Sequence, residues 1–94
     1  MKCVLKLFIT GNTPSSIRAQ KNLKIICQDL NLSDYEIQTI DVIKHPELAE
    51  ENKIVAIPTL IKESPPPQQK IIGDLSDKDR VLSGLELVSQ TIGE

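Results

Sequence analysis

Hydrophobic residues fill positions 4–9 almost without interruption, and Lys6 is the one polar position among them. This pattern is typical of a strand that is covered on both faces of a sheet. A glycine, a capping side chain at Asn12 or Thr13 and a proline follow, which together suit the start of a helix. We therefore predict a central strand and then a helix that runs to about Leu30.

The predicted helix has two different faces. At about 100° per residue, one apolar stripe can pack on a sheet: Ala19, Leu23, Ile26, Cys27 and Leu30. The opposite face mixes long cations with apolar side chains: Arg18, Lys21, Lys24, Ile17 and Ile25. This second face is either solvated or an interface with another subunit or a partner, because apolar residues among long cations suit a contact surface.

The middle of the chain predicts two more strands around a short helix. Positions 35–43 read as a strand, with core positions at Ile37, Ile40 and Val42. Positions 46–52 predict a helix whose acidic residues suit the positive end of its dipole. Positions 54–61 predict a strand that Pro58 interrupts, because proline cannot donate a ladder hydrogen bond.

The last third predicts one strand and one helix. Positions 62–69 contain prolines at 65–67 and are too stiff for a helix, so we expect a loop there, and positions 71–72 suit a short strand. Ser76 with Asp79 forms a variant capping box that opens a helix toward the C-terminus. Gly84 weakens this helix by roughly 1 kcal/mol relative to alanine. The expected order is βαβαββα, an α/β fold.

Composition narrows the function classes. The chain has 94 residues, which fits a single domain over 1–94, and only 2% are aromatic, which disfavours stacking platforms for bases. Eleven basic and 13 acidic residues give a net charge of −2, so we expect neither a nucleic-acid nor a membrane partner. Cys3 and Cys27 have no redox or zinc spacing, so we expect packed, reduced thiols in the cytoplasm.

The sequence lacks the residues that an enzyme would need. The element order, with Pro58 before a strand, resembles the thioredoxin fold, in which a C-x-x-C motif opens the first helix. Here that position reads Thr-Pro-Ser-Ser. His45 is the single histidine, and Glu47, Glu50 and Glu51 suit one wet face of a short helix. We therefore expect no catalysis, no metal site and no cofactor.

Four separated motifs resemble the KaiB family of circadian clock proteins. They are Leu5-Lys6-Leu7 with Gly11-Asn12-Thr13-Pro14, Ile40-Asp41-Val42 with Pro46 and residues 48–54, Pro58-Thr59-Leu60, and Ile71-Ile72-Gly73-Asp74-Leu75-Ser76. The match covers nearly the whole chain and keeps its register. The resemblance implies a non-enzymatic regulator that docks on the ATPase ring of a hexameric KaiC kinase, with KaiA or a KaiB-like sensor histidine kinase as further partners.

The resemblance also implies two folds. One is a thioredoxin-like monomer that binds the ring. The other is a resting homo-oligomer, a tetramer or dimer, whose C-terminal half is rearranged and which we expect in the free protein. Family positions that tip this balance match Gly84 and Glu86, and proline isomers can slow the exchange at Pro58, Pro65, Pro66 and Pro67. We expect Gly84→Ala to favour the thioredoxin-like state.

The docking positions of the family match Lys53 and the strand around Glu36 and Gln38. Clock members usually carry a small residue and a lysine in place of Glu36 and Gln38, and a tyrosine in place of Cys3. If the partner of the family presents an acidic surface here, loss of a lysine and gain of a glutamate weaken docking on that surface. Two interpretations therefore stay open: a clock component, and a KaiB paralogue that serves as a stress-response or signalling adaptor with its own KaiC-like partner.

Overall fold

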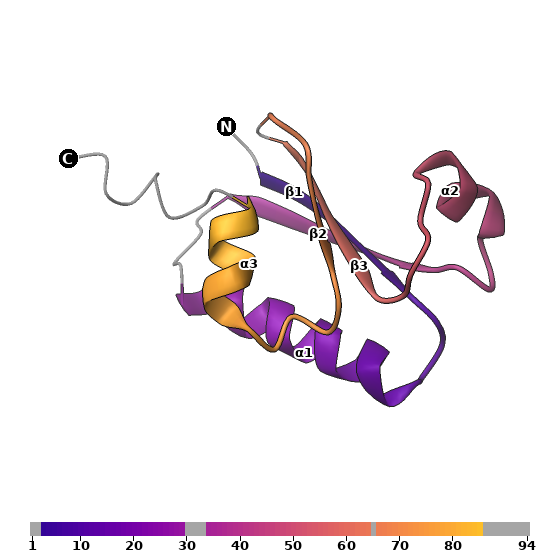
Figure 1. The fold of residues 1–94 in the computed structure, drawn as a ribbon, viewed down its shortest axis with the longest axis horizontal. Helices are drawn as coiled ribbons and strands as arrows, with labels where there is room; N and C mark the ends of the chain where they lie inside the picture. The colour runs from indigo at the N-terminus through magenta and orange to yellow at the C-terminus, as the bar shows by residue number, and fades with distance from the viewer. Residues whose placement is uncertain (1–2, 30–33, 65, 86–94) are drawn as a thin grey trace.

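The computed structural model describes residues 3–29, 34–64 and 66–85, and it has the predicted element order (Figure 1). Within these residues lie seven elements: β1 (Cys3–Ile9), α1 (Pro14–Asp29), β2 (Tyr35–Asp41), α2 (Pro46–Glu51), β3 (Thr59–Ser64), β4 (Gln69–Ile72) and α3 (Lys78–Leu85). The α/β, thioredoxin-like arrangement that the sequence predicts is confirmed.

Strand β1 lies inside the sheet, whose order is β2-β1-β3-β4. It pairs in parallel with β2 and antiparallel with β3, and β4 pairs antiparallel with β3. Leu7 and Phe8 point to opposite faces because side chains alternate along a strand, yet both are fully buried. The prediction of a central strand covered on both sides is therefore confirmed.

Helices α1 and α3 cover one face of this sheet. The core there joins side chains of β1, β3, β4 and both helices, with Leu75 from the loop between β4 and α3: Cys3, Leu5, Leu7, Ile9, Ala19, Leu23, Ile26, Cys27, Leu60, Ile71, Leu75 and Val81. Four of the five predicted stripe residues of α1 belong to this core, and Leu30 lies outside the described residues. Of the predicted core positions in and after β2, Ile37, Ile40 and Val42 are only half-buried, because β2 is an edge strand.

Thr13, rather than Asn12, caps the start of α1. Its hydroxyl oxygen accepts a hydrogen bond from the Ser16 backbone N–H at 3.3 Å, and Pro14 takes the first helical position. The fully buried Ser16 hydroxyl in turn accepts the Thr10 backbone N–H at 3.0 Å. The segment in which thioredoxins carry their redox pair is thus a hydrogen-bonded capping turn.

The bounds of the third and fourth strands differ from the prediction. The third strand begins at Thr59, not at Ile54, because the Ile54 N–H bonds to the Ala49 carbonyl oxygen at the end of α2 and Pro58 has no N–H to offer a ladder. The same strand continues to Ser64, and β4 begins at Gln69, so both enter the stretch that the sequence indicates is a loop.

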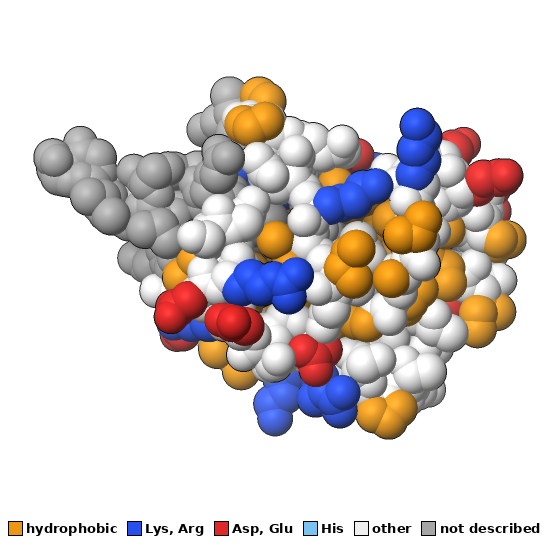
Figure 2. Space-filling model, in the orientation of Figure 1, with side chains coloured by type: hydrophobic (Ala, Val, Ile, Leu, Met, Phe, Trp, Pro, Cys, Tyr) orange, Lys and Arg blue, Asp and Glu red, His pale blue; other side chains and the backbone are white. Residues whose placement is uncertain are grey.

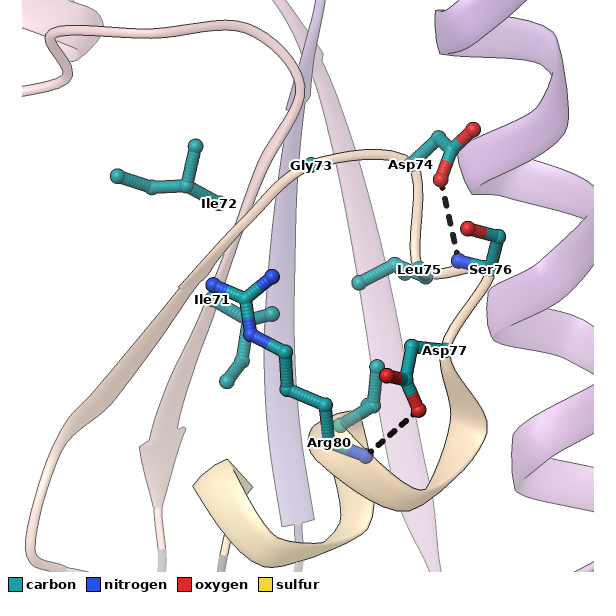
Figure 3. Close-up of a pocket in the computed structure, with 9 residues that line it drawn as sticks. Ile71, Ile72, Gly73, Asp74, Leu75, Ser76, Asp77 and Arg80 are labelled. Carbon is teal, nitrogen blue, oxygen red and sulfur yellow. Dashed lines mark hydrogen bonds between the residues drawn. The ribbon is translucent and has the colours of Figure 1, made fainter.

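The last helix is capped by Asp77 and not by Ser76. The Asp77 carboxylate accepts the Arg80 N–H at 3.2 Å, and the Ser76 N–H donates instead to Asp74 at 3.1 Å (Figure 3). Helix α3 is described as far as Leu85, and its predicted continuation lies outside the described residues.

Polar contacts join the loop after β4 and the start of α3 to α1. Arg18 Nε lies 2.9 Å from Asp74 Oδ2, and Asn22 donates to the Asp74 carbonyl oxygen at 2.9 Å. Lys78 Nζ lies 2.6 Å from Asp29 Oδ2. These contacts hold the C-terminal half of the chain against α1, so they stabilise this fold over any arrangement in which that half moves away.

The Asp74 contact predicts a pH-dependent stability. Its hydrogen bonds, from Arg18 first and then from Ser76, lower the pKa of the carboxyl below its ordinary value of 3.8. The folded state thus favours the ionised form, and the stabilisation is present above pH 3.8 and lost as the pH falls through the lower folded value. We expect Asp74→Asn to lower the melting temperature at pH 7 and to lose this effect in strong acid, measured by thermal unfolding from pH 7 to 2. A difference that is constant over this range would contradict the assignment.

Gly84 packs directly on the core, which changes what its substitution should do. A Cβ atom at this position would overlap Ile71 Cδ1 in this fold. The helix-propensity gain of about 1 kcal/mol from alanine is then opposed by the cost of overpacking, about 1–3 kcal/mol.

We therefore expect Gly84→Ala alone to leave the free energy of unfolding unchanged or lower. In the Ile71→Val background, which removes the overlapping methyl group, the same change should stabilise the fold by about 1 kcal/mol. Urea unfolding of the four proteins of this double-mutant cycle measures the coupling. Equal effects of Gly84→Ala in both backgrounds would disprove the contact.

Candidate functional site

The two cysteines do not offer reactive thiols. Both are free and buried, as the sequence predicts. Burial raises the pKa of Cys27 to about 11, with a further contribution from Cys3. Burial also raises the pKa of Cys3, against the opposing effect of the Lys62 cation. Both thiols stay protonated at neutral pH, whereas exchange chemistry needs a thiolate.

Neither a metal cluster nor a buried histidine site occurs among the described residues. No group of three or more His, Cys, Asp or Glu among them could hold a metal ion. His45 lies 3.6 Å from Glu47, and both side chains are more than half exposed. The hollow beside the loop from Ile71 to Val81 measures about 60 Å³, well below the usual size of a ligand pocket (Figure 3). None of the helices that the structure describes could span a membrane.

The sheet face away from α1 and α3 carries the predicted docking residues. Strand register places Gln38 beside Lys6, Lys6 beside Ile61, and Ile61 beside Lys70. Directly paired residues share a face, so these four form one row across all four strands of the described sheet, about 14 Å long. We call the face that carries this row the α2 face, because Lys70 contacts the backbone that ends α2.

Lys53 projects from the turn that ends α2. The Lys53 N–H donates to the Glu50 carbonyl oxygen at 3.1 Å, and the Ile54 N–H donates to that of Ala49 at 2.9 Å. These two hydrogen bonds form a Schellman motif, whose left-handed position is usually a glycine. Lys53 occupies it with φ of 55°, so the chain accepts backbone strain to hold an exposed lysine there.

Lys70 fixes this turn to the sheet. Its ammonium group donates to the carbonyl oxygens of Asn52, at 2.9 Å, and Lys53, at 3.5 Å, where the helix dipole is negative. A hollow of about 400 Å³ lies beside the turn and is lined by Glu51, Asn52, Lys53, Ile61, Gln68 and Lys70. The lysine that the resemblance singles out therefore stands at the rim of a depression on the α2 face.

Charges on the α2 face are arranged unevenly. Lys6 forms an ion pair with Glu63 at 2.9 Å. Glu36 accepts a hydrogen bond from the Gln38 amide at 2.7 Å, at the β2 edge. Lys53 has no ion-pair partner among the described residues. The face thus presents a free cation at the α2 end and a carboxylate at the opposite edge.

The other candidate residues lie apart from this face or outside the description. Pro58 is buried just before β3, and its carbonyl oxygen accepts the Gly73 N–H at 2.9 Å. The peptide bonds Ile57–Pro58 and Pro66–Pro67 are cis. Pro65 and Glu86 lie outside the described residues.

The basic face of α1 is exposed, which fits both a solvated face and an interface with another subunit or a partner. Ile17 and Ile25 are 50% and 43% exposed. Arg18 is committed to Asp74, whereas Lys21 and Lys24 have no carboxylate partner in the part of the chain that the structure describes.

Sequence reasoning missed the residues that support Lys53. Lys70 and Ile61 reach it only through the pairing of β3 with β4, which connects positions far apart from residues 52–53. The sequence did carry a local signal for the turn itself. The position after a helix end is often a glycine, and here a lysine occupies it, which marks the position as unusual.

Comparison with known proteins decides the family. A sequence model of the KaiB domain matches residues 6–87. The chain belongs to the KaiB family. It is 56% identical over 91 residues to the circadian clock oscillator protein KaiB of Rippkaea orientalis, covering 97% of this chain and 88% of the relative. Synechocystis KaiB1 is 55% identical over the same length, covering 97% and 87%. These names support a role in a circadian clock.

Solved structures agree with a thioredoxin-like fold for this KaiB-family chain. The N-terminal domain of Synechococcus elongatus SasA has a TM-score of 0.75 at 27% identity, covering 90% of this chain and 84% of that one. Mitochondrial thioredoxin 3 from Saccharomyces cerevisiae has a TM-score of 0.71 at 21% identity, covering 89% and 76%. The thioredoxin likeness shows the fold alone.

The strained turn at Lys53 predicts a separation of stability from charge. Lys53→Gly should raise the free energy of unfolding by about 1 kcal/mol, because glycine adopts positive φ without a Cβ penalty. Lys53→Ala removes the same charge and keeps the penalty, so it is the matched control. Urea unfolding measures both variants. Equal stability of the glycine and alanine variants would show that the turn is not strained.

Proposed function

We propose that this KaiB-family chain is a non-enzymatic regulator that docks through its α2 face on the ring of a hexameric KaiC-like ATPase and modulates its phosphorylation cycle. The observation that carries the proposal is Lys53: an exposed cation without a carboxylate partner among the described residues, held at strained φ. Strain of this kind is typical of positions kept for function. The protonated thiols support a role without redox chemistry.

The arrangement of the α2 face suggests what the partner surface looks like. An acidic group of the ring would meet Lys53, and the hollow of about 400 Å³ beside it, lined mostly by polar and charged residues, would take a polar side chain of the partner. Opposite Glu36, the partner would carry a neutral or basic group. The SasA N-terminal domain has a similar shape, so we propose that such a sensor domain competes for the same ring surface.

A second function is an adaptor role outside a clock, in a stress response or in signalling, with a KaiC-like partner of its own. The observation that favours it is the carboxylate of Glu36, hydrogen-bonded to Gln38 on the docking edge. A ring surface that is acidic along its whole length would repel this edge. The two functions share the docking face and differ in the charge pattern of the ring.

We further propose that the free protein acts in the cytoplasm and exchanges this fold with a resting oligomer, a dimer or tetramer, in which the C-terminal half is rearranged. Leu75 has φ of 64° in the loop that would move, and Gly84 weakens α3. The ion pairs of Asp74 and Asp29 oppose that movement. A small difference between such opposing terms is what lets two folds coexist.

Binding to the cognate KaiC-like ring with ATP tests the proposal by size-exclusion chromatography. We expect a complex of this chain with the ring, and at least tenfold weaker binding for Lys53→Ala. Lys44→Ala is the control, because Lys44 is exposed and lies outside the face. Glu36→Ala should strengthen binding to a ring from a circadian clock and weaken binding to the partner of an adaptor. The absence of a complex over hours would overturn the docking function.

A further inference from the structure

The outer face of α1 carries an exposed stripe that the docking function does not use. It consists of Ile17, Lys21, Lys24 and Ile25, spaced at i, i+4, i+7 and i+8, so that all four share one side of the helix. Figure 2 shows Lys and Arg side chains together along the lower margin, over α1, next to hydrophobic side chains. We call these four residues the α1 stripe.

Two hollows adjoin the α1 stripe. The first measures about 440 Å³ and is lined by Asn12, Ile17, Gln20, Lys21 and Lys24. The second measures about 210 Å³, lies between α1 and the edge strand β2, and is lined by Leu7, Gln20, Leu23, Lys24, Ile37 and Thr39. Because Gln20 and Lys24 line both, the hollows meet along the helix. Leu7 and Leu23 are core residues, so the second hollow reaches the core.

The charges beside these hollows are uncompensated. Neither Lys21 nor Lys24 has a carboxylate within ion-pair distance among the described residues. The remaining charged residues of α1 are occupied, since Arg18 pairs with Asp74 and Asp29 pairs with Lys78. A complementary surface would therefore bring carboxylates to two lysines and apolar side chains to two isoleucines.

The same charges exclude two other occupants. A second copy of this chain, packed α1 against α1, would place Lys21 and Lys24 against the same two lysines of that copy. Repulsion between these like charges would destabilise the contact. A nucleic acid would meet only two free cations flanked by isoleucines, on a protein whose net charge is −2. An acidic, apolar segment of another protein satisfies both the lysines and the isoleucines.

The spacing favours a helical segment. Ile17 and Ile25 are eight residues apart, which is about 12 Å along the axis of α1. Apolar side chains at i and i+7 of a second helix are about 10.5 Å apart, close to this separation. Acidic side chains at i+3 and i+4 of that helix would lie between them and face Lys21 and Lys24.

We propose that the α1 stripe is a docking site for an acidic amphipathic helix of another protein. The site lies on the opposite side of the sheet from Lys53, because α1 packs on the face away from the row of Gln38, Lys6, Ile61 and Lys70. The proposal does not rest on ring docking, and both surfaces can be occupied together.

Amide chemical-shift mapping of the full chain with designed peptides tests the site. The probe is a 14-residue alanine-based helix with leucines at i and i+7 and glutamates at i+3 and i+4. One control peptide replaces the glutamates with lysines, and another replaces the leucines with alanines. We expect the acidic peptide to shift resonances of the α1 stripe and to bind at least tenfold more tightly than either control.

Variants of the chain sharpen the test. Lys24→Glu should weaken binding of the acidic peptide at least tenfold and gain affinity for the lysine peptide, while Lys44→Glu, a charge reversal outside both hollows, should change neither. Ile25→Ser should weaken binding of the acidic peptide without adding affinity for the lysine peptide, because it removes an apolar contact and changes no charge. Circular dichroism checks that each variant is folded.

Four outcomes would overturn the proposal. In the first, the acidic peptide shifts no resonance of the α1 stripe. In the second, the lysine peptide binds equally well, which would make the contact purely apolar. In the third, Lys24→Glu binds the acidic peptide as tightly as the unchanged chain does. In the fourth, the chain self-associates with rising concentration and Ile25→Ser abolishes this, which would assign the stripe to a second copy.

Discussion

Burial of β1 on both faces is the constraint on which the rest of the molecule depends. Leu7 and Phe8, neighbours in sequence, are both fully buried on opposite sides of the sheet. One side must therefore be covered by α1 and α3, and the other by side chains and backbone on the α2 side. A polar residue at either position would leave an unpaired group in the interior, which costs several kcal/mol. The strand buried on both faces thus separates the α2 face from the α1 stripe, the two surfaces for which we propose different partners.

In the function that we propose, the α2 face meets a charged partner rather than a substrate. Lys53 lies in the turn that ends α2, and Lys70 of β4 ties this turn to the sheet, so a local turn and a long-range contact together fix Lys53. The positive φ at Lys53 is costly, and glycine would fit better. The docking function that we propose would explain why a long cation occupies that position. The chain differs from thioredoxins at the start of α1, where the buried Ser16 lies in the segment that carries the reactive cysteines of a thioredoxin.

Most of the fold could be predicted from the sequence because its signals are local. The apolar run of β1 and the Pro14 start of α1 each act within a few residues, and the cap of α1 was predicted at Asn12 or Thr13, of which the structure has Thr13. The predicted start of the third strand, at Ile54, was wrong by several positions. The Ile54 N–H donates to the turn that ends α2 and is therefore not available to the sheet. The overlap between Gly84 and Ile71 joins separate elements, so no local pattern could show it. The residues that position Lys53 could not be predicted from the sequence for the same reason.

In the function that we propose, this KaiB-family chain binds the ring with its α2 face and keeps α1 free of the ring. Isoleucine methyl spectra of the labelled chain in complex with its cognate ring test this directly, because isoleucines mark both surfaces. Strand pairing places the side chains of Ile61 and Ile72 on the α2 face, while Ile17 and Ile25 lie on α1. The account predicts shifted or broadened methyl signals for Ile61 and Ile72 and unchanged signals for Ile17 and Ile25. Changes centred on Ile17 and Ile25, with Ile61 and Ile72 unaffected, would contradict it.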